Sequence, residues 1–385
     1  MKTVLFDLFE AQPAGTSKFH GGGEYIKTVY QYLAGHLPDE CSLIVFYNDR
    51  SFLDPWILDS FADHRIKAEV IHRREEVRYL FDRHKIDSFY SGLPYFYKKA
   101  WIPETVRVCG TIHGLRGVEL PCDRYAYKYA SGRESRVQRL RFLLRGKIKE
   151  KKIRQFRDCM ELLDEIVCVS NHTRYAIRNY FPSMDRHVRV FYTPAKYVGP
   201  ESGMEKECCH REVEGKYILL GGADRSEKNG YRAVRALEEL FREGMLEGYR
   251  VVTVGGMPGK IAEIIHRQER YVCLGYVEAG ILENLYRYCD LFLYPSLNEG
   301  FGMPPLEAMK YGKTCIVSGV TSLPEICGDA VYYCNPYDID EIKNRLLMAA
   351  EQKISAEKIE NHLRGIRSRQ DADLKALCEY ITGRT

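Results

Sequence analysis

The feature that most constrains this chain is a regular alternation of short apolar runs with longer segments of helical periodicity. The runs are rich in β-branched and aromatic residues, and this alternation is typical of parallel sheets joined by crossover helices. The runs cover residues 3–7, 42–47, 68–71, 88–90, 106–113, 165–170, 217–221, 250–255, 271–274, 290–295, 314–318 and 331–334. We therefore predict the α/β class, with two Rossmann-like, doubly wound domains.

The length of the chain also indicates two domains. A chain of 385 residues is too long for one ordinary core. Residues 193–203 are rich in Pro and Gly, which is typical of an interdomain linker. We predict an N-terminal domain over 1–195, a C-terminal domain over 196–365 and a C-terminal helix over 366–385, with packing of that helix on the first domain as one option. In open parallel sheets ligands bind beyond the carboxyl ends of the strands, so we expect the two domains to face each other across a cleft that holds the active site.

Composition argues against several classes of protein. Apolar residues make up 45% of the chain, which argues against disorder. No apolar run approaches the roughly 20 residues of a membrane span, and the first residues lack the cleavage site of a signal peptide. The 13 cysteines include no Cys-x-x-Cys pair, which argues against a zinc ribbon or a disulfide framework. We predict a cytoplasmic protein with reduced, mostly buried thiols.

One stretch, 298–312, places Glu299 and Glu307 on either side of two glycines and two prolines. Glycine and proline exclude a plain helix at Glu299, so we predict a loop after the buried strand 291–294 and a helix over 306–311. A glycine turn before a helix N-terminus suits a diphosphate, and carboxylates on both sides can accept from sugar or ribose hydroxyls. The alternative is an ordinary helix with an acidic first turn.

This stretch resembles the Glu-x7-Glu signature of the retaining family-4 glycosyltransferases, which have the two-domain GT-B fold. The resemblance covers most of the chain and includes residues 21–25, 111–113, 169–174 and 219–229. It implies that Glu299 binds hydroxyls of the transferred sugar and that Glu307 binds the ribose. It also implies donor contacts from the backbone of Gly300, Phe301, Gly302 and Met303.

Two cations follow the run 217–221. Arg225 and Lys228 precede a helix that we expect to begin near Tyr231. A leaving diphosphate gains negative charge as the glycosidic bond breaks, so fixed cations stabilise the transition state more than the ground state. The family resemblance assigns both residues this role. The alternative is a pair of solvated charges in an ordinary turn.

Four further residues complete the predicted site. His113 ends the run 106–113, and the resemblance implies that its ring contacts the transferred sugar; the alternative is a buried structural histidine. Gly114 stands where the family has Asp, so no adjacent carboxylate orients the ring as a base. Gly22 and Gly23 fall at the family's N-terminal glycine loop and could let the acceptor side approach the donor phosphates. Tyr276 could contact the nucleotide base.

The sequence offers two Asp-x-Asp pairs that could bind a metal at a diphosphate. Asp338 precedes a predicted helix and is expected to cap it, and Asp371 falls in the polar C-terminal helix. Arg225, Lys228 and the helix dipole can replace a metal's charge. We therefore predict no metal and no cofactor beyond the nucleotide sugar.

Charge is distributed unevenly along the chain. Residues 1–195 hold 32 Lys and Arg against 24 Asp and Glu, whereas the whole chain carries +4. The excess concentrates in residues 124–157, with 13 basic and two acidic residues among apolar ones. Basic amphipathic helices there could lie on an anionic membrane. A solvated face and a nucleic-acid patch are the alternatives, and we expect no nucleic acid partner.

Together these features predict a metal-independent, retaining hexosyltransferase in the cytoplasm, with peripheral binding to the membrane as one option. The donor is a UDP- or GDP-linked sugar, and the acceptor is a saccharide or lipid-linked saccharide of cell-surface polysaccharide or glycolipid assembly. Three alternatives stay open. They are a soluble enzyme with a small acceptor, a nucleotide-sugar-binding regulator without turnover, and a non-hydrolysing epimerase of similar architecture.

Overall fold

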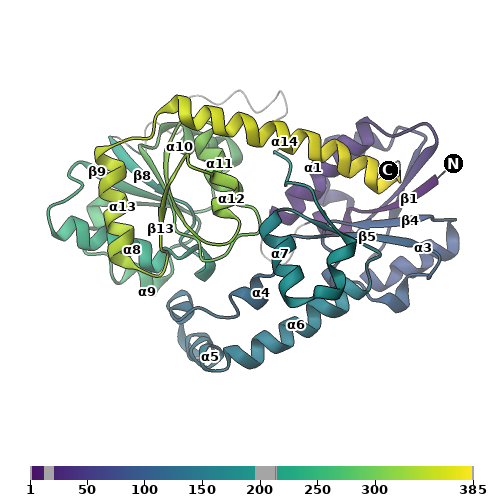
Figure 1. Cartoon of the computed structure of the whole chain (residues 1–385), viewed down its shortest axis with the longest axis horizontal. Helices are drawn as coiled ribbons and strands as arrows, with labels where there is room; N and C mark the ends of the chain where they lie inside the picture. The colour runs from purple at the N-terminus through teal and green to yellow at the C-terminus, as the bar shows by residue number, and fades with distance from the viewer. Residues whose placement is uncertain (1, 13–20, 196–212, 214, 384–385) are drawn as a thin grey trace. The chain divides into compact units, whose positions relative to one another are not determined.

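The computed structural model describes residues 2–12, 21–195, 213 and 215–383, and the chain divides into two compact units (Figure 1). The first unit comprises Met1–Leu115, Ile153–Tyr197 and Arg367–Thr385. The second comprises Arg116–Lys152 and Val198–Ile366. All but the first three residues of the predicted linker 193–203 lie outside the described part of the chain.

The first unit is built on a parallel sheet of seven strands in the order β3-β2-β1-β4-β5-β6-β7. The strands are β1 (Lys2–Asp7), β2 (Cys41–Tyr47), β3 (Ile66–Val70), β4 (Ser88–Ser91), β5 (Arg107–Ile112), β6 (Glu165–Cys168) and β7 (Val188–Val190). Val4, Leu5 and Phe6 of β1 are fully buried, as expected for a strand covered on both faces. The strand order reverses between β1 and β4, so their carboxyl ends form the switch point of this sheet.

Helices α1 (Gly21–Gly35), α2 (Pro55–Ser60), α3 (Val77–Arg83) and α7 (Asn171–Tyr180) belong to this unit. Helix α7 begins where the Ser170 hydroxyl accepts a hydrogen bond from the Thr173 N–H at 3.2 Å. The last helix, α14 (Ala356–Thr382), ends in the first unit. There the Tyr380 hydroxyl donates to Glu165 and the Tyr380 carbonyl accepts from Arg107.

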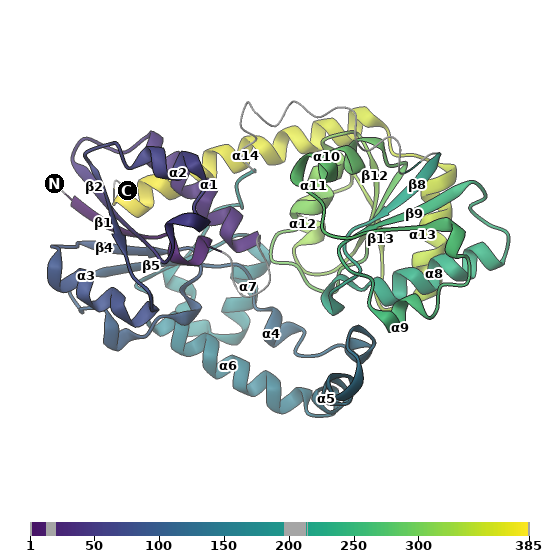
Figure 2. The ribbon, with the colours of Figure 1, turned by 180° about the vertical axis from the view of Figure 1, so that it is seen from behind.

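The second unit has a parallel sheet of six strands in the order β10-β9-β8-β11-β12-β13 (Figure 2). The strands are β8 (Lys216–Leu220), β9 (Tyr249–Val254), β10 (Tyr271–Leu274), β11 (Leu291–Tyr294), β12 (Thr314–Ser318) and β13 (Tyr332–Cys334). The helices are α8 (Gly230–Arg242), α9 (Gly259–Ala262), α10 (Ala279–Tyr288), α11 (Met303–Met309), α12 (Leu323–Cys327) and α13 (Ile339–Glu351). The order reverses between β8 and β11, which makes their carboxyl ends the switch point here.

The predicted α/β class with two doubly wound sheets is confirmed. Each predicted run overlaps a strand of one of the two sheets. The structure adds β7, an edge strand that we did not predict. Its three residues, Val-Arg-Val, are too few to show a periodicity.

Residues 116–152 group with the second unit, whereas the predicted boundary at residue 195 assigns them to the first domain. They form α4 (Arg116–Glu119), α5 (Gly132–Leu143) and the start of α6 (Arg145–Glu161). They are anchored by a buried ion pair in which both terminal nitrogens of Arg232 on α8 donate to the Asp123 carboxylate, at 3.1 and 3.0 Å. Tertiary contacts of this kind leave no periodicity in the sequence, so the observed boundary differs from the predicted one.

Nine of the eleven cysteines in the described part of the chain are buried, as predicted. Burial raises the pKa of the Cys109 thiol to about 12, so this thiol stays protonated at neutral pH. Among the described residues, none of the helices combines the length and the apolar character needed to cross a bilayer.

Replacing Asp123 with alanine is expected to lower the free energy of unfolding by about 3–5 kcal/mol, because the buried Arg232 guanidinium would lose its carboxylate. Chemical denaturation followed by circular dichroism measures the change. The matched control is Asp340→Ala, because that carboxylate is 90% exposed and lies 3.9 Å from Lys343. We expect little change in the free energy of unfolding of this control variant. Equal losses in the two variants would contradict the anchoring role of Asp123.

Candidate active site

The candidate site lies at the switch point of the second sheet. Lys228 belongs to the turn after β8, and Glu299 to the loop after β11. The Lys228 ammonium donates to Glu299 Oε1 at 2.6 Å, and the two side chains are only 11% and 14% exposed. The structure therefore brings into contact two residues that the sequence analysis assigned to different parts of a donor molecule.

Two further side chains hold Glu299, and sequence reasoning did not identify either. The Tyr294 hydroxyl donates to Glu299 Oε1 at 2.7 Å, and the Ser296 hydroxyl donates to the same oxygen at 2.6 Å. Among the residues that the structure describes, Oε2 has no hydrogen-bond partner. Oε1 is thus fixed by protein groups while Oε2 can accept from a ligand hydroxyl. The signal that could have found Tyr294 is its place at the carboxyl end of an otherwise apolar strand.

Burial by itself raises the pKa of the Glu299 carboxyl group, but the Lys228 ammonium and the hydrogen bonds from Lys228, Ser296 and Tyr294 outweigh it, so the pKa is lowered. Glu299 is therefore ionised at neutral pH. Because its folded pKa lies below the ordinary value of 4.5, its contribution to stability is complete above that value. The contribution is lost as the pH falls through the folded pKa.

The turn that carries Lys228 is fixed by its neighbour Asn229. This residue adopts φ 64°, and its amide donates to the Pro295 carbonyl at 3.0 Å and to the Pro336 carbonyl at 2.7 Å. Its amide oxygen accepts from Arg232 at 2.9 Å. Asn229 thus ties the turn after β8 to the loops after β11 and β13, which holds the Lys228 backbone in place.

The loop between β11 and α11 is held just as firmly. The Ser322 hydroxyl lies 3.0 Å from the Glu299 carbonyl and 2.9 Å from the Phe301 carbonyl, and can donate to either. Gly302 adopts φ 105°, and a Cβ there would lie 2.5 Å from Leu323, so only glycine fits. The buried Phe301 side chain anchors the middle of the loop. The structure therefore defines the backbone path between Glu299 and α11.

Helix α11 begins at Met303, three residues earlier than the predicted start at 306, and ends at Met309. Pro304 and Pro305 fall in its first turn, where their missing N–H groups break no intrahelical bond. The predicted helix, which Pro305 was expected to begin, therefore starts too late and ends too late. Gly300 and Gly302 lie between the end of β11 and the start of α11, as predicted, whereas Met303 is the first residue of the helix.

The remaining predicted donor residues of this unit are Glu307, Arg225 and Tyr276. Glu307 lies on α11, and its charge adds to burial in raising the pKa of Tyr286 on α10. Arg225 is 57% exposed and lies 3.7 Å from Glu227. Tyr276 follows β10 and is 69% exposed. The donor roles of Glu307, Arg225 and Tyr276 stay predictions.

His113 belongs to the first unit and follows β5. One of its ring nitrogens, Nε2, lies 2.9 Å from the Gly92 carbonyl and so donates to it. The ring packs edge-on against Tyr25, with centroids 4.7 Å apart. These contacts fix the orientation of the imidazole, and its contact with a sugar stays a prediction.

Gly22 and Gly23 lie in the first turn of α1, so the predicted glycine loop at these two positions is wrong. A Cβ at Gly22 would lie 2.8 Å from the Leu93 side chain. Close packing of α1 on the loop after β4 therefore explains Gly22 without a ligand. A donor contact of Gly22 and Gly23 stays a prediction.

The first unit also holds a carboxylate that the sequence analysis missed. Asp7 ends β1 at the switch point of its sheet and is fully buried. It accepts from the Ser91 hydroxyl at 2.6 Å and from the Tyr97 hydroxyl at 2.9 Å. Burial, followed by the nearby charge of Glu10, raises the pKa of Asp7 to about 7. Buried carboxylates of this kind give no pattern in a single sequence.

Among the described residues, no group of three or more His, Cys, Asp or Glu side chains gathers as a metal site. Asp338 caps α13 by accepting from the backbone N–H groups of Asp340 and Glu341, so the predicted capping role is confirmed. Asp371 lies within α14. Independence from metals stays a prediction.

Comparison with known proteins identifies the second unit. Residues 210–364 match the family model of the glycosyl transferases group 1. We call these residues, which are similar to that family, the group 1 domain. This match covers the turn with Lys228, the loop with Glu299 and the helix with Glu307.

Relatives with curated names support the group 1 assignment. Serotype-specific mannosyltransferase WbdA of Escherichia coli is 38% identical over 111 residues, which are 26% of this chain and 13% of that protein. O-antigen chain mannosyltransferase B of Escherichia coli is 46% identical over 78 residues, or 20% of each chain. The similarity to these relatives thus spans only about an eighth to a fifth of their length.

The likeness in fold extends over the whole chain. The Anabaena protein HepE, solved with UDP and glucose, matches with a TM-score of 0.64 and 15% identity, and the match covers 100% of both chains. At this identity the likeness concerns the fold alone. The group 1 domain is therefore part of a GT-B architecture, as predicted.

Replacing Asp7 with asparagine is expected to flatten the dependence of stability on pH. The folded pKa of about 7 lies above the ordinary value of 3.8, so the folded protein binds more protons between these values and loses stability as the pH rises. Denaturation midpoints at pH 5 and pH 8 measure the effect. Asp59→Asn on α2 serves as the matched control. If the denaturation midpoint depends equally on pH in the Asp7→Asn and Asp59→Asn variants, the raised pKa of Asp7 is contradicted.

Proposed function

We propose that this protein transfers a hexose from a UDP- or GDP-linked sugar to an acceptor hydroxyl, with retention of anomeric configuration. The observation that carries the proposal is the contact between Lys228 and Glu299 at the switch point of the group 1 domain. Mannose is the first sugar to test, because the named relatives are mannosyltransferases. A nucleotide donor agrees with the UDP bound to HepE.

Lys228 supplies the positive charge of the proposed site. Its ammonium is 11% exposed and held by Tyr294 and Glu299, so it does not need to reorganise when a reaction begins. A buried, fixed cation stabilises the negative charge that develops on a leaving diphosphate. Arg225 is exposed and lies three residues earlier in the same turn, where it can add a second positive charge. Two cations make a metal ion unnecessary in this proposal.

Glu299 orients the transferred sugar. Its Oε1 is fixed by three protein donors, so its Oε2 would accept from a sugar hydroxyl. Glu307 would bind the ribose hydroxyls from the first half of α11. The backbone of Gly300, Phe301, Gly302 and Met303 would line the phosphates, and Tyr276 would contact the base.

The acceptor proton needs a base on the face that the leaving group occupies. In a retaining transfer the departing phosphate oxygen can take the proton from the acceptor hydroxyl on that same face. His113 would then contact the sugar without acting as the base. This scheme requires no cofactor other than the nucleotide sugar.

Replacing Lys228 with methionine is expected to lower the turnover number by about 10²–10³, because one charge-stabilising group is lost. Transfer and donor hydrolysis are measured with GDP-mannose and UDP-glucose as separate donors. The control is Lys358→Met on α14, which removes an exposed ammonium paired with Asp329 and should leave the rate unchanged. Binding of a donor without transfer or hydrolysis by the wild-type protein would instead support a nucleotide-sugar-binding regulator.

The acceptor in this proposal is a lipid-linked saccharide, and the surface of α5 supports it. Three apolar side chains of α5 and the one directly after it are exposed, namely Val137, Leu140, Leu143 and Leu144. Exposed arginines flank them at positions 133, 136, 139 and 141. Apolar side chains among cations favour the boundary of an anionic bilayer.

A triple variant, in which Arg139, Arg141 and Leu143 are each replaced by alanine, glutamine or serine, is expected to lose flotation with vesicles that contain anionic lipid. Each basic residue contributes about 1 kcal/mol at such a surface. The matched control removes two exposed arginines of α14, Arg364 and Arg367. If neither variant changes flotation, or if the wild-type protein does not float, a small soluble acceptor is favoured.

A further inference from the structure

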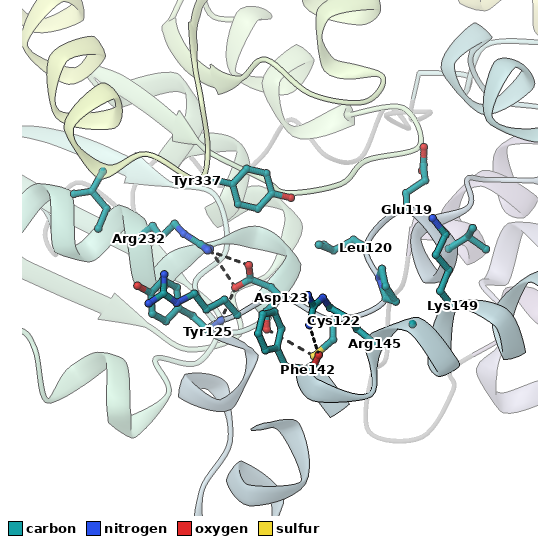
Figure 3. A pocket seen from close by; sticks show the side chains of 15 residues that line it. Glu119, Leu120, Cys122, Asp123, Tyr125, Phe142, Arg145, Lys149, Arg232 and Tyr337 are labelled. Carbon is teal, nitrogen blue, oxygen red and sulfur yellow. Dashed lines mark hydrogen bonds and ion pairs between the residues drawn. The ribbon is translucent and has the colours of Figure 1, made fainter. Parts of the chain in front are cut away.

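The second unit contains a cavity of about 620 Å³ between the segment 116–152 and α8 (Figure 3). Its walls come from α4, the residues after it, the end of α5 and the start of α6, with Arg232 and Tyr337 opposite. A volume of this size suits a small molecule, since such sites span roughly 300–1,000 Å³. The sequence analysis assigned no function to this part of the chain other than membrane contact.

The cavity combines cations with aromatic rings. Arg124, Arg145 and Lys149 line it, together with the rings of Tyr125, Phe142 and Tyr337. Arginine binds phosphate oxygens through paired N–H groups, and lysine binds them as a point charge. Aromatic rings offer flat apolar surfaces that suit the C–H face of a sugar. A saccharide that carries phosphate fits both features.

The buried ion pair does not cancel this positive charge. Asp123 and Arg232 neutralise each other through two hydrogen bonds. Of the charged residues that line the cavity, three cations then face one further carboxylate, Glu119. Figure 3 shows Arg145 and Lys149 on the same side of the cavity, across from Arg232. The cavity therefore keeps an excess of positive charge.

Two contacts connect the cavity to the proposed transfer site. Glu119 lines the cavity and accepts from the Asn298 amide at 3.1 Å, and Asn298 directly precedes Glu299. On the opposite wall, Arg232 donates to Asn229, which directly follows Lys228. One wall thus contacts the side chain of the residue before Glu299, and the other contacts the side chain of the residue after Lys228. A molecule in the cavity lies beside the loops that carry the site.

We propose that this cavity binds the phosphate-bearing part of the saccharide acceptor. The inference rests on the proposed function, because it names the acceptor of that same transfer. Arg145 and Lys149 bind the phosphate, and the rings of Tyr125 and Phe142 pack on the adjoining sugar. The group 1 domain then contributes to both substrates, with the donor at Lys228 and the acceptor phosphate at the neighbouring cavity.

The first experiment is calorimetric titration of the full chain with mannose 1-phosphate, methyl mannoside and inorganic phosphate. We expect mannose 1-phosphate to bind more tightly than either of the others. Arg145→Ala combined with Lys149→Ala should weaken its binding about tenfold or more, because charge-assisted bonds are lost. The matched control is Arg136→Ala on α5, which is exposed and does not line the cavity. Equal binding to the double variant and the wild type overturns the proposal.

A second variant closes the cavity without removing charge. Gly146 lines it, and a Cβ at this position meets no atom within 4 Å. Gly146→Phe should therefore weaken mannose 1-phosphate binding while the melting temperature stays at the wild-type value, and Gly146→Ala is its control. Unchanged affinity in Gly146→Phe also counts against the proposal.

Two further binding experiments distinguish a failure of this inference from a failure of the proposed function. If the Lys228→Met variant still binds mannose 1-phosphate, the ligand binds at the cavity. If this variant no longer binds it, the ligand binds at the donor site and the inference is overturned. A mannosyl phosphate ester of decanol that binds more tightly than the free sugar phosphate identifies a lipid-linked acceptor, and equal binding identifies a soluble one. Cavity binding without any sugar transfer refutes the proposed function and leaves the cavity as an anion site.

Discussion

The contact between Lys228 and Glu299 is the interaction on which the candidate site depends. Removing two charges from water is costly, and the cost is offset only when the charges attract each other and further hydrogen bonds satisfy them. Here Tyr294 and Ser296 supply those bonds. The Ser296 hydroxyl also lies 3.0 Å from the Glu227 carbonyl, a second acceptor for its one proton, so the loops after β8 and β11 meet at the same place. The site is therefore built where two neighbouring strands of a parallel sheet end.

The segment 116–152 forms part of the second unit, although its place in the sequence predicts that it belongs to the first unit. Arg116 pairs with Glu227 at 2.8 Å, Glu119 with Asn298, and Asp123 with Arg232. Each of these contacts falls within a few residues of Lys228 or Glu299. The segment thus supports the loops of the site as well as enclosing the cavity. Its exposed helix α5 remains available for a surface or a partner.

Much of the fold could be predicted from the sequence, because buried parallel strands are read as apolar runs bounded by turns. The strand β7 could not, since three residues carry too little pattern. Residue type and spacing, with the family resemblance, single out Glu299, Glu307 and Lys228 as candidates, and the structure brings Glu299 and Lys228 into contact. The bond between Lys228 and Glu299, the roles of Tyr294 and Ser296, and the burial of Asp7 could not, because each depends on which loops the tertiary fold brings together.

A crystal structure of the protein soaked with GDP-mannose, and a second one with UDP-glucose, tests the donor site most directly. We expect diphosphate oxygens at about 3 Å from the Lys228 ammonium and a hydroxyl of the sugar on Glu299 Oε2. A nucleotide sugar that binds elsewhere on the chain, with the Lys228–Glu299 contact unchanged and no ligand atom near Oε2, would contradict the proposed site.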